Sequence, residues 1–403
     1  MKQLENDEYM LNLWFCNIEG VGNVSRRKLL EAFHTIANIY DAREELIKNV
    51  LGDKIIKAFY ESKNANKVIE ISERLNERKI KFVYPGHEDY PKKLLNIYDY
   101  PMGLYVRGNL GNKINEFNSS IAIVGSRVSS AYGREIANNF ARNLAMNGIS
   151  IISGLARGID SAAHKGALVA NGHTIAVLGC GINVTYPKEN IELFLEVERN
   201  GAIISEYGLD VSPNAGFFPC RNRIISGLSD GVCVVEAKKK SGSLITVDCA
   251  LEQGKQVYSV PGRLFDQNSE GTNNLIKQGA YCVCSYEDIL SDLFGEDYTK
   301  NKDIYIENKE KYIENKTEIK DNCENDKKKY KSNIIKTEGN VNKNCLAPME
   351  KMVYSCLSLE PTYIDDVINM AGLGITRTIS TLYMLEEKKV VKQPLKGYYI
   401  VAI

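Results

Sequence analysis

Short apolar segments alternate with helical patterns between residues 116 and about 295, and this alternation constrains the fold more than any other feature of the sequence. The segments are mostly continuous runs, which is typical of strands buried on both faces of a sheet. Repeated strand–helix alternation implies right-handed crossovers. We therefore predict an α/β domain with an extended Rossmann-like, doubly wound and mostly parallel sheet. Its expected strands are residues 121–124, 149–152, 174–178, 202–204, 232–235 and 256–260, and its expected helices are residues 132–146, 159–169, 189–198, 223–228 and 244–253.

Two segments precede this domain. In residues 1–65 apolar side chains recur at helical spacing, and a Gly20-Val21-Gly22 turn separates two expected helices. This pattern predicts a helical domain of the helix-hairpin-helix or sterile-alpha-motif type. Residues 66–115 are predicted to be a connector that extends the Rossmann domain, with a helix at 68–75 and a strand at 80–84.

Two further segments follow the domain. Residues 296–345 are rich in charged and amide side chains and poor in large apolar ones, so they cannot bury enough surface to fold. We predict a disordered linker there. In residues 346–403, three expected helices and a hairpin predict a C-terminal winged-helix domain. Its third helix carries few basic residues, chiefly Arg377, so we expect a partner contact or weak duplex binding rather than sequence-specific readout.

Composition limits the possible partners and the compartment. The 403 residues include 51 Lys and Arg and 51 Asp and Glu, so an anion site must come from a local arrangement of charge. No apolar run reaches the roughly 18 residues of a membrane-spanning helix, and the first residues are acidic. We therefore expect no membrane contact and a cytoplasmic location. The ten cysteines form no Cys-x-x-Cys pair, which predicts buried free thiols, including Cys282 and Cys284, rather than disulfides or a zinc site.

The loops after the expected strands have the composition of an anion site. In an open parallel sheet, ligands bind beyond the carboxyl ends of the strands. Glycine lets a ligand approach the backbone, free N–H groups at a helix start attract phosphate, and arginine matches phosphate oxygens. Several such loops along one edge favour an extended polyanion over a single nucleotide. The loops contain Gly125-Ser126-Arg127, Arg157-Gly158, Tyr186-Pro187-Lys188, Phe218-Pro219 with Arg221-Asn222-Arg223, and Lys238-Lys239-Lys240-Ser241-Gly242-Ser243.

Several of these residues also have a purely structural explanation. Gly125 and Gly154 fit tight strand–helix turns, and Ser243 fits the N-cap of a helix. Asp160 and His164 lie four residues apart on one expected helix. That spacing fits a contact on the helix surface better than an acid/base pair.

The arginines and the missing motifs also bear on the class of protein. Arg221 and Arg223 are able to form structural ion pairs with Glu206 or Glu236 instead of binding phosphate. No Gly-x-Gly-x-x-Gly and no Gly-x-x-x-x-Gly-Lys-Ser/Thr motif is present, and we find no catalytic triad or metal cluster. We therefore expect a binding protein rather than an enzyme, with no cofactor and no metal.

Seven sequence blocks are spread in order over the whole α/β domain. They are residues 123–127 (IVGSR), 153–160 (SGLARGID), 178–181 (LGCG), 205–208 (SEYG), 218–228 (FPCRNRIISGL), 241–246 (SGSLIT) and 260–262 (VPG). Together these blocks resemble the DprA/Smf family of bacterial DNA-processing proteins. The resemblance implies a homodimer that binds single-stranded DNA and loads the RecA recombinase onto it, in natural transformation and homologous recombination. It also implies phosphate binding, motif by motif, by Gly125, Ser126, Arg127, Arg157, Gly158, Lys188, Phe218, Arg221, Asn222 and Arg223, to which their place in the last loop adds Ser241, Gly242 and Ser243.

One departure from the family pattern bears on DNA affinity. The family commonly has a lysine and an aromatic residue just before Phe218, where this chain has Pro213-Asn214-Ala215-Gly216-Phe217. One phosphate contact is therefore missing. The Lys238-Lys239-Lys240 run is the candidate to replace it.

We consider three functional hypotheses. The leading one is sequence-independent binding of single-stranded DNA, in which backbone contacts supply most of the affinity and Phe218 offers a stacking face. The second is a nucleotide-binding enzyme of the phosphoribohydrolase type, in which Glu236 or Asp160 acts on a base–ribose bond, although the Pro-Gly-Gly-x-Gly-Thr block of those enzymes is absent. The third is a protein-interaction adaptor that bridges RecA and other factors without DNA.

Overall fold

The computed structural model describes residues 7–110 and 119–295 and, in part, residues 353–401. The chain separates into two compact units, Met1–Lys311 and Tyr312–Ile403. The linker predicted at 296–345 lies outside the described residues, so it stays a prediction. None of the described helices combines the length and the apolar character that crossing a bilayer requires.

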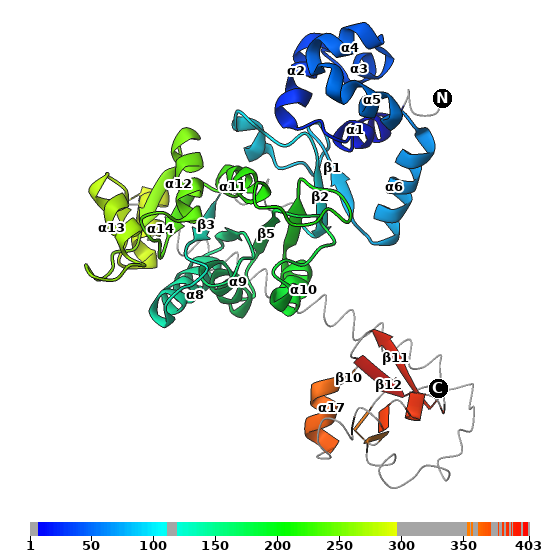
Figure 1. Cartoon of the computed structure of the whole chain (residues 1–403). Coiled ribbons are helices and arrows are strands. Elements are labelled where there is room, and N and C mark those ends of the chain that lie inside the picture. Colours follow the sequence, from blue (N-terminus) through cyan, green and yellow to red (C-terminus); the bar gives the residue numbers. More distant parts are fainter. Residues whose placement is uncertain are drawn as a thin grey trace. The chain divides into compact units, whose positions relative to one another are not determined.

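A nine-stranded sheet forms the centre of the first unit (Figure 1). Its strands are β1 (Lys81–Val83), β2 (Leu104–Gly108), β3 (Ser120–Val124), β4 (Ser150–Ser153), β5 (Thr174–Leu178), β6 (Ala202–Ser205), β7 (Gly231–Val234), β8 (Gln256–Ser259) and β9 (Tyr281–Cys282). They pair in the order β1-β2-β6-β5-β4-β3-β7-β8-β9. All pairs from β6 to β9 are parallel, and β1–β2 and β2–β6 are antiparallel. This confirms the predicted mostly parallel sheet.

Helices cover both faces of this sheet. They are α8 (Ala131–Met146), α9 (Ile159–Val169), α10 (Ile191–Asn200), α11 (Phe217–Leu228), α12 (Gly242–Glu252), α13 (Glu270–Lys277) and α14 (Tyr286–Phe294). Successive side chains of a strand point to opposite faces. Ile121 and Ile123 of β3 pack in the apolar cluster of α8 and α9, whereas Ala122 and Val124 pack in that of α11 and α12. The continuous apolar runs are therefore strands buried on both faces.

Helix α11 begins at Phe217 and not at 223, as the sequence predicted. Proline disfavours helical backbone in the residue before it, which makes a Phe-Pro pair read as a loop. The first turn of a helix tolerates proline, however, because its N–H groups have no partner within the helix. Phe218, Arg221 and Asn222 therefore lie on a helix instead of in a loop.

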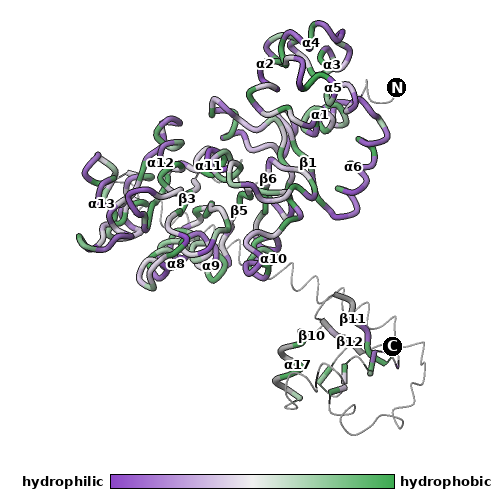
Figure 2. Tube along the Cα trace, viewed as in Figure 1, coloured by the Kyte–Doolittle hydropathy of each residue, from purple (hydrophilic) through white to green (hydrophobic). Residues whose placement is uncertain are grey.

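The N-terminal part of the first unit is helical. It contains α1 (Glu8–Cys16), α2 (Asn23–Phe33), α3 (Ile36–Asp41), α4 (Glu44–Leu51), α5 (Asp53–Ser62) and the longer α6 (Ala65–Glu77), which Figure 2 colours mainly as hydrophilic. Trp14 is 1% exposed and donates to Ser62 Oγ at 3.0 Å. Its apolar cluster continues to Phe82 of β1 and Tyr105 of β2, so these helices share a core with the edge of the sheet. The helix-hairpin-helix or sterile-alpha-motif identity stays a prediction.

The connector and the cysteines complete this unit. The expected helix and strand of the connector are observed as α6 and β1, and a 3-10 helix, η1 (Lys92–Asn96), packs against α11. No disulfide joins the described cysteines, and Cys180 and Cys233 are buried as predicted, whereas Cys249 is only half-buried and Cys220 is exposed. The prediction of burial is wrong for Cys282 and Cys284, which are exposed because β9 lies at the edge of the sheet.

The second unit has a small apolar core of its own. A three-stranded sheet pairs β10 (Thr362–Tyr363), β12 (Tyr398–Val401) and β11 (Val391–Leu395) in antiparallel fashion, and α17 (Ile364–Ala371) follows β10. The second helix expected in this region, at residues 363–371, and the expected hairpin, at residues 390–392 and 398–401, are thus observed. The first and third expected helices lie partly outside the described residues, so the winged helix stays a prediction.

Candidate nucleic-acid interface

A cavity of about 840 Å³ lies at the carboxyl ends of the strands, where β3 pairs with β7. The chain adds β4, β5 and β6 on one side of β3 and then β7 on the other. This is the switch point at which open α/β sheets bind ligands. Nine of the thirteen predicted binding residues line the cavity: Gly125, Ser126, Arg127, Phe218, Arg221, Asn222, Ser241, Gly242 and Ser243.

Phe218 lies in the first turn of α11, and its ring is covered by neighbouring side chains. The Tyr186 ring centroid is 5.5 Å away, and the guanidinium carbons of Arg127 and Arg221 lie 5.0 and 6.0 Å from the Phe218 centroid. Gly179 leaves space for the ring, because a Cβ there would lie 2.8 Å from Phe218 Cδ1. These contacts hold Arg127 at the cavity. A base stacking on Phe218 would compete with them.

Arg221 is buried in the wall of the cavity, with 5% of its surface exposed. Its Nη1 donates to the carbonyl oxygens of Gly154, at 2.8 Å, and Val177, and its Nε donates to Asn222 Oδ1 at 3.1 Å. Gly154 makes this position possible, because a Cβ there would lie 2.5 Å from Nη1. Burial lowers the pKa of Arg221 to about 10, so the side chain stays charged at neutral pH. Arg221 therefore supplies a fixed positive charge.

Charge in the cavity is positive although the chain as a whole is neutral. Asp160 is the one carboxylate among the lining residues, and its Oδ2 accepts hydrogen bonds from the N–H groups of Gly154 and Ala156 at 3.1 and 3.4 Å. Burial raises the pKa of Asp160, against the effect of the nearby Arg221 charge. The other charged residues that line the cavity are Arg127, Arg221, Lys238 and Lys240.

Two helices begin at the cavity wall. Helix α11 has no side-chain cap at Gly216. At the start of α12, Ser241 is the N-cap, and its Oγ accepts from the Ser243 N–H at 3.4 Å. The reading of Ser243 as the N-cap is therefore wrong, because α12 starts at Gly242. Asn222 Nδ2 donates to the Gly242 carbonyl at 3.3 Å and joins the two helix starts. Helix N-termini carry partial positive charge.

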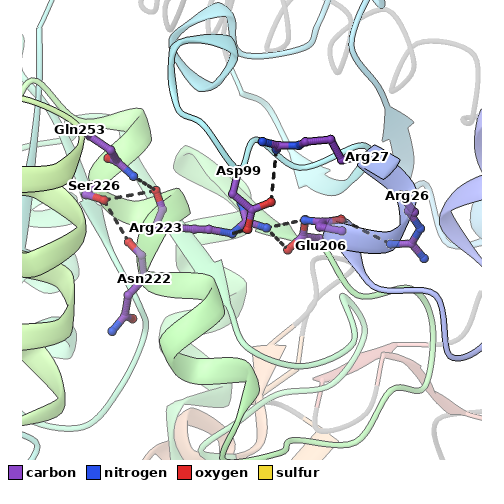
Figure 3. A network of polar contacts seen from close by, with 9 residues as sticks. Arg26, Arg27, Asp99, Glu206, Asn222, Arg223, Ser226 and Gln253 are labelled. Atoms are coloured by element: carbon purple, nitrogen blue, oxygen red, sulfur yellow. Dashed lines mark hydrogen bonds and ion pairs between the residues drawn. The ribbon is translucent and has the colours of Figure 1, made fainter. Parts of the chain in front are cut away.

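Arg223 does not line the cavity and instead takes part in a network of ion pairs (Figure 3). Its Nη2 donates to both carboxylate oxygens of Glu206, at 2.7 and 2.6 Å, and its Nε lies 3.2 Å from Asp99 Oδ2. The side chains of Arg223 and Glu206 are each 11% exposed. The network reaches α2, because Asn23 donates to Glu206 and Arg27 lies 3.4 Å from Asp99. The structural ion pair with Glu206 considered from the sequence is thus observed.

Three predicted residues lie beside the cavity. Arg157 and Gly158 line a second groove of about 400 Å³, and Arg157 pairs with Glu189. Gly158 has φ of +76° and its backbone is pressed against the Ser126 carbonyl, so only glycine fits. Lys188 is exposed in the 3-10 helix η2 (Lys188–Asn190) and lines neither cavity nor groove.

The predicted surface contact between Asp160 and His164 is wrong, because the face of α9 that carries both residues packs inward. His164 is fully buried, and its Nδ1 lies 2.8 Å from Thr174 Oγ1. The Thr174 hydroxyl donates to the Ile151 carbonyl, so His164 Nδ1 is the donor to Thr174. Burial lowers the pKa of His164 to about 3.

The residues that sequence reasoning missed depend on folding for their position. Asp99 comes from the connector and Asn23 from α2, and no local pattern marks either as a neighbour of Arg223. Lys238 and Lys240 line the cavity while Lys239 does not. The Lys238-Lys239-Lys240 run in the sequence points to this loop, but it does not show which of the three lysines line the cavity.

The fold and the site together define a Rossmann-like α/β protein with a cationic cavity at the switch point of its sheet, and a cavity of this charge suits an anionic ligand. The family model for DNA recombination-mediator protein A matches residues 81–294. The chain belongs to this family, the DprA/Smf family. The resemblance read from the loop motifs is therefore confirmed.

Individual relatives match different shares of the chain. Protein Smf of Synechocystis sp. is 36% identical over 293 residues, which are 72% of this chain and 74% of that protein. Protein Smf of Escherichia coli is 51% identical over 207 residues, so the match spans 51% of this chain and only 54% of that relative. The X-ray structure of DNA processing protein A from Streptococcus pneumoniae is 35% identical, with a TM-score of 0.60, and covers 70% of this chain and 97% of that one.

Proposed function

We propose that this chain binds single-stranded DNA, without sequence preference, through sugar–phosphate groups that enter the cavity between β3 and β7. The observation that carries the proposal is the charge of the lining. Four positive side chains, Arg127, Arg221, Lys238 and Lys240, face a single carboxylate, Asp160, that is engaged with backbone N–H groups. Phosphates are common to every sequence, so a site that recognises them binds without regard to the bases.

The shape of the site favours a single strand over a duplex. The lining residues come from the loops after β3, β4, β5, β6 and β7 and from the N-terminal parts of α9, α11 and α12, so they surround a concave space. A duplex is stiff over many base pairs and carries its phosphates on the outside of a wide cylinder. A single strand bends freely, and its backbone is able to follow a positively charged groove.

Lys238 and Lys240 support the proposed replacement of the missing lysine. Pro213 and Ala215, which stand in the stretch where the family commonly has a lysine, line the cavity without adding charge. The two lysines line the same cavity from the loop after β7. We propose that they make the phosphate contact that the substitution removes.

The wider role is also a proposal. Family membership and relatives described as DNA processing proteins support a part in natural transformation and homologous recombination. We propose that the protein works in the cytoplasm as a homodimer and passes its bound strand to RecA. A pull-down of RecA before and after nuclease treatment tests this. RecA capture by a chain that binds no oligonucleotide would favour the adaptor hypothesis.

The hydrolase alternative has less support from the geometry. Glu236 is 4% exposed and accepts hydrogen bonds from the Ser130 N–H, at 2.9 Å, and from the Ser130 hydroxyl at the start of α8. Asp160 is likewise engaged with backbone N–H groups. Neither carboxylate is therefore free to act as a general base. Release of a free base from added nucleotides would restore this alternative.

Titration of a fluorescent oligo-dT tests the proposed function. Wild type should bind it in the presence of duplex competitor, and the affinity should fall steeply with salt because counterions are released. Arg127→Ala, Lys238→Ala and Lys240→Ala should each weaken binding and reduce the salt slope by about 1. Lys239→Ala is the matched control, because Lys239 is exposed but does not line the cavity.

Two results would contradict the proposal. One is binding that does not respond to salt. The other is an equal loss of affinity in the Lys239→Ala control and in the variants of the two lining lysines.

A further inference from the structure

A second groove lies next to the cavity, on the other side of the loop that follows β4. Ala156 lines the cavity, and the next residue, Arg157, lines the groove. The remaining walls come from α8, α9 and η2, and they include Arg134, Asn138, Ser161, Lys165 and Asn190. One loop of backbone therefore separates the two sites.

The groove is lined by two positive side chains, Arg134 and Lys165, that are not paired with a carboxylate in the described part of the chain. Arg134 Nη1 donates to the Ser129 carbonyl at 2.7 Å, and Lys165 is exposed. Neither side chain forms an ion pair with an acid in the described part of the chain. Glu135 is the one carboxylate that lines the groove. An anion would therefore meet uncompensated positive charge there.

Arg157 is available to the same anion. It pairs with Glu189, but the side chains are 64% and 50% exposed. An exposed pair of this kind adds little stability, because water screens both charges and the side chains lose freedom when they pair. A phosphate is therefore able to replace Glu189 at a small cost.

The backbone at Ala156–Arg157 forms a ridge between the cavity and the groove, and close packing keeps this ridge thin. The Ile159 N–H donates to the Ser126 carbonyl at 3.3 Å, and Gly158 lies against the same carbonyl. Ser126 itself lines the cavity. Helix α9 begins at this ridge without a side-chain cap, but the N–H groups of Ile159 and Ser161 already donate to the Ser126 and Ala156 carbonyls, so the positive charge of the groove comes from its side chains.

We propose that the groove is a second phosphate subsite for the same DNA strand. A strand whose phosphates occupy the cavity crosses the Ala156–Arg157 ridge and places its next phosphates between Arg134, Arg157 and Lys165. No aromatic side chain lines the groove, so it takes the sugar–phosphate backbone and leaves the bases outside. This inference rests on the proposed function, and it assigns a path to the strand.

Oligonucleotides of two lengths distinguish binding at the cavity alone from binding at both the cavity and the groove. We would compare oligo-dT of about four and about sixteen nucleotides, the range of site sizes on small single-strand-binding domains. The variant Arg134→Gln/Lys165→Gln should lower the affinity for the long strand several-fold and reduce its salt slope by about 2, with a much smaller effect on the short strand. The matched control is Arg142→Gln/Arg199→Gln, which removes two exposed charges that line neither site.

Each outcome decides between defined possibilities. If wild type binds neither strand, the proposed function fails. If wild type binds both but the groove variant behaves like its control on the long strand, the cavity proposal stands and the groove proposal is overturned. Equal losses on short and long strands would also overturn it, because the groove would then not be a separate subsite. The single variant Lys165→Gln repeats the test without the risk of misfolding, because the Lys165 side chain is exposed on α9 and its replacement disturbs no packing.

Discussion

Replacing Glu206 by alanine should destabilise the first unit by roughly 3 kcal/mol. Arg223 donates to both Glu206 oxygens at 2.7 and 2.6 Å, and each side chain is only 11% exposed. Removing one partner of a buried pair leaves an uncompensated charge, which costs about 3–5 kcal/mol. Asp99 remains 3.2 Å from Arg223 Nε, so we take the lower end of that range. Asn23 also loses the oxygen to which it donates.

Thermal unfolding followed by calorimetry measures this effect. An unfolding entropy of about 2.1 cal/mol/K per residue gives a Tm shift of about 1.5 °C per kcal/mol for a unit as large as Met1–Lys311, so we expect a decrease of about 5 °C. The matched control is Glu189→Ala, which breaks a pair whose side chains are 64% and 50% exposed. That change should shift the Tm far less, because water screens both charges of an exposed pair.

A Glu206→Ala protein that unfolds at the same temperature as the Glu189→Ala protein would refute the reasoning. It would mean that the Arg223 network adds no more than a surface pair. Arg223 would then be free to leave the network and contact phosphate.

Three further predictions concern single residues. Arg223→Ala should lower the Tm strongly but reduce oligo-dT affinity less than Arg127→Ala, because only Arg127 lines the cavity; the opposite order of affinities would contradict this. Burial lowers the pKa of His164 from 6.5 to about 3, so between these two pH values the unfolded chain binds a proton at His164 that the folded chain does not. The free energy of unfolding should therefore fall by up to about 1.4 kcal/mol per pH unit as the pH drops from 6.5 towards 3. Urea unfolding of His164→Asn, which keeps a donor for Thr174, should lack this part of the pH dependence. Gly154→Ala places a Cβ 2.5 Å from Arg221 Nη1, so it should lower the free energy of unfolding by about 1–3 kcal/mol and weaken DNA binding. The control Gly22→Ala should change neither, because nothing lies within 4 Å of its Cβ.

The elements of the sheet were predictable because their signals are local. Strand β5 and helix α9 were predicted at their observed bounds, and the other five expected strands within one residue, whereas β9 was not among the expected strands. A run of apolar residues or a helical repeat depends only on neighbours in the sequence. The place of the cavity was predictable for a related reason, since parallel strands bring all the loops at their carboxyl ends to one edge.

The sequence by itself therefore determined the sheet, the family and the edge that carries the site, while the tertiary structure decided which side chains face the cavity. Arg221 and Arg223 are two residues apart, and on a helix that spacing turns them to different sides. Arg221 lies at the cavity because Gly154 leaves room for it, and Arg223 is held by Glu206 and Asp99. These partners come from the loops after β4 and β6 and from the connector, and only the packing of α11 against them brings them together. No pattern within one segment encodes such a contact.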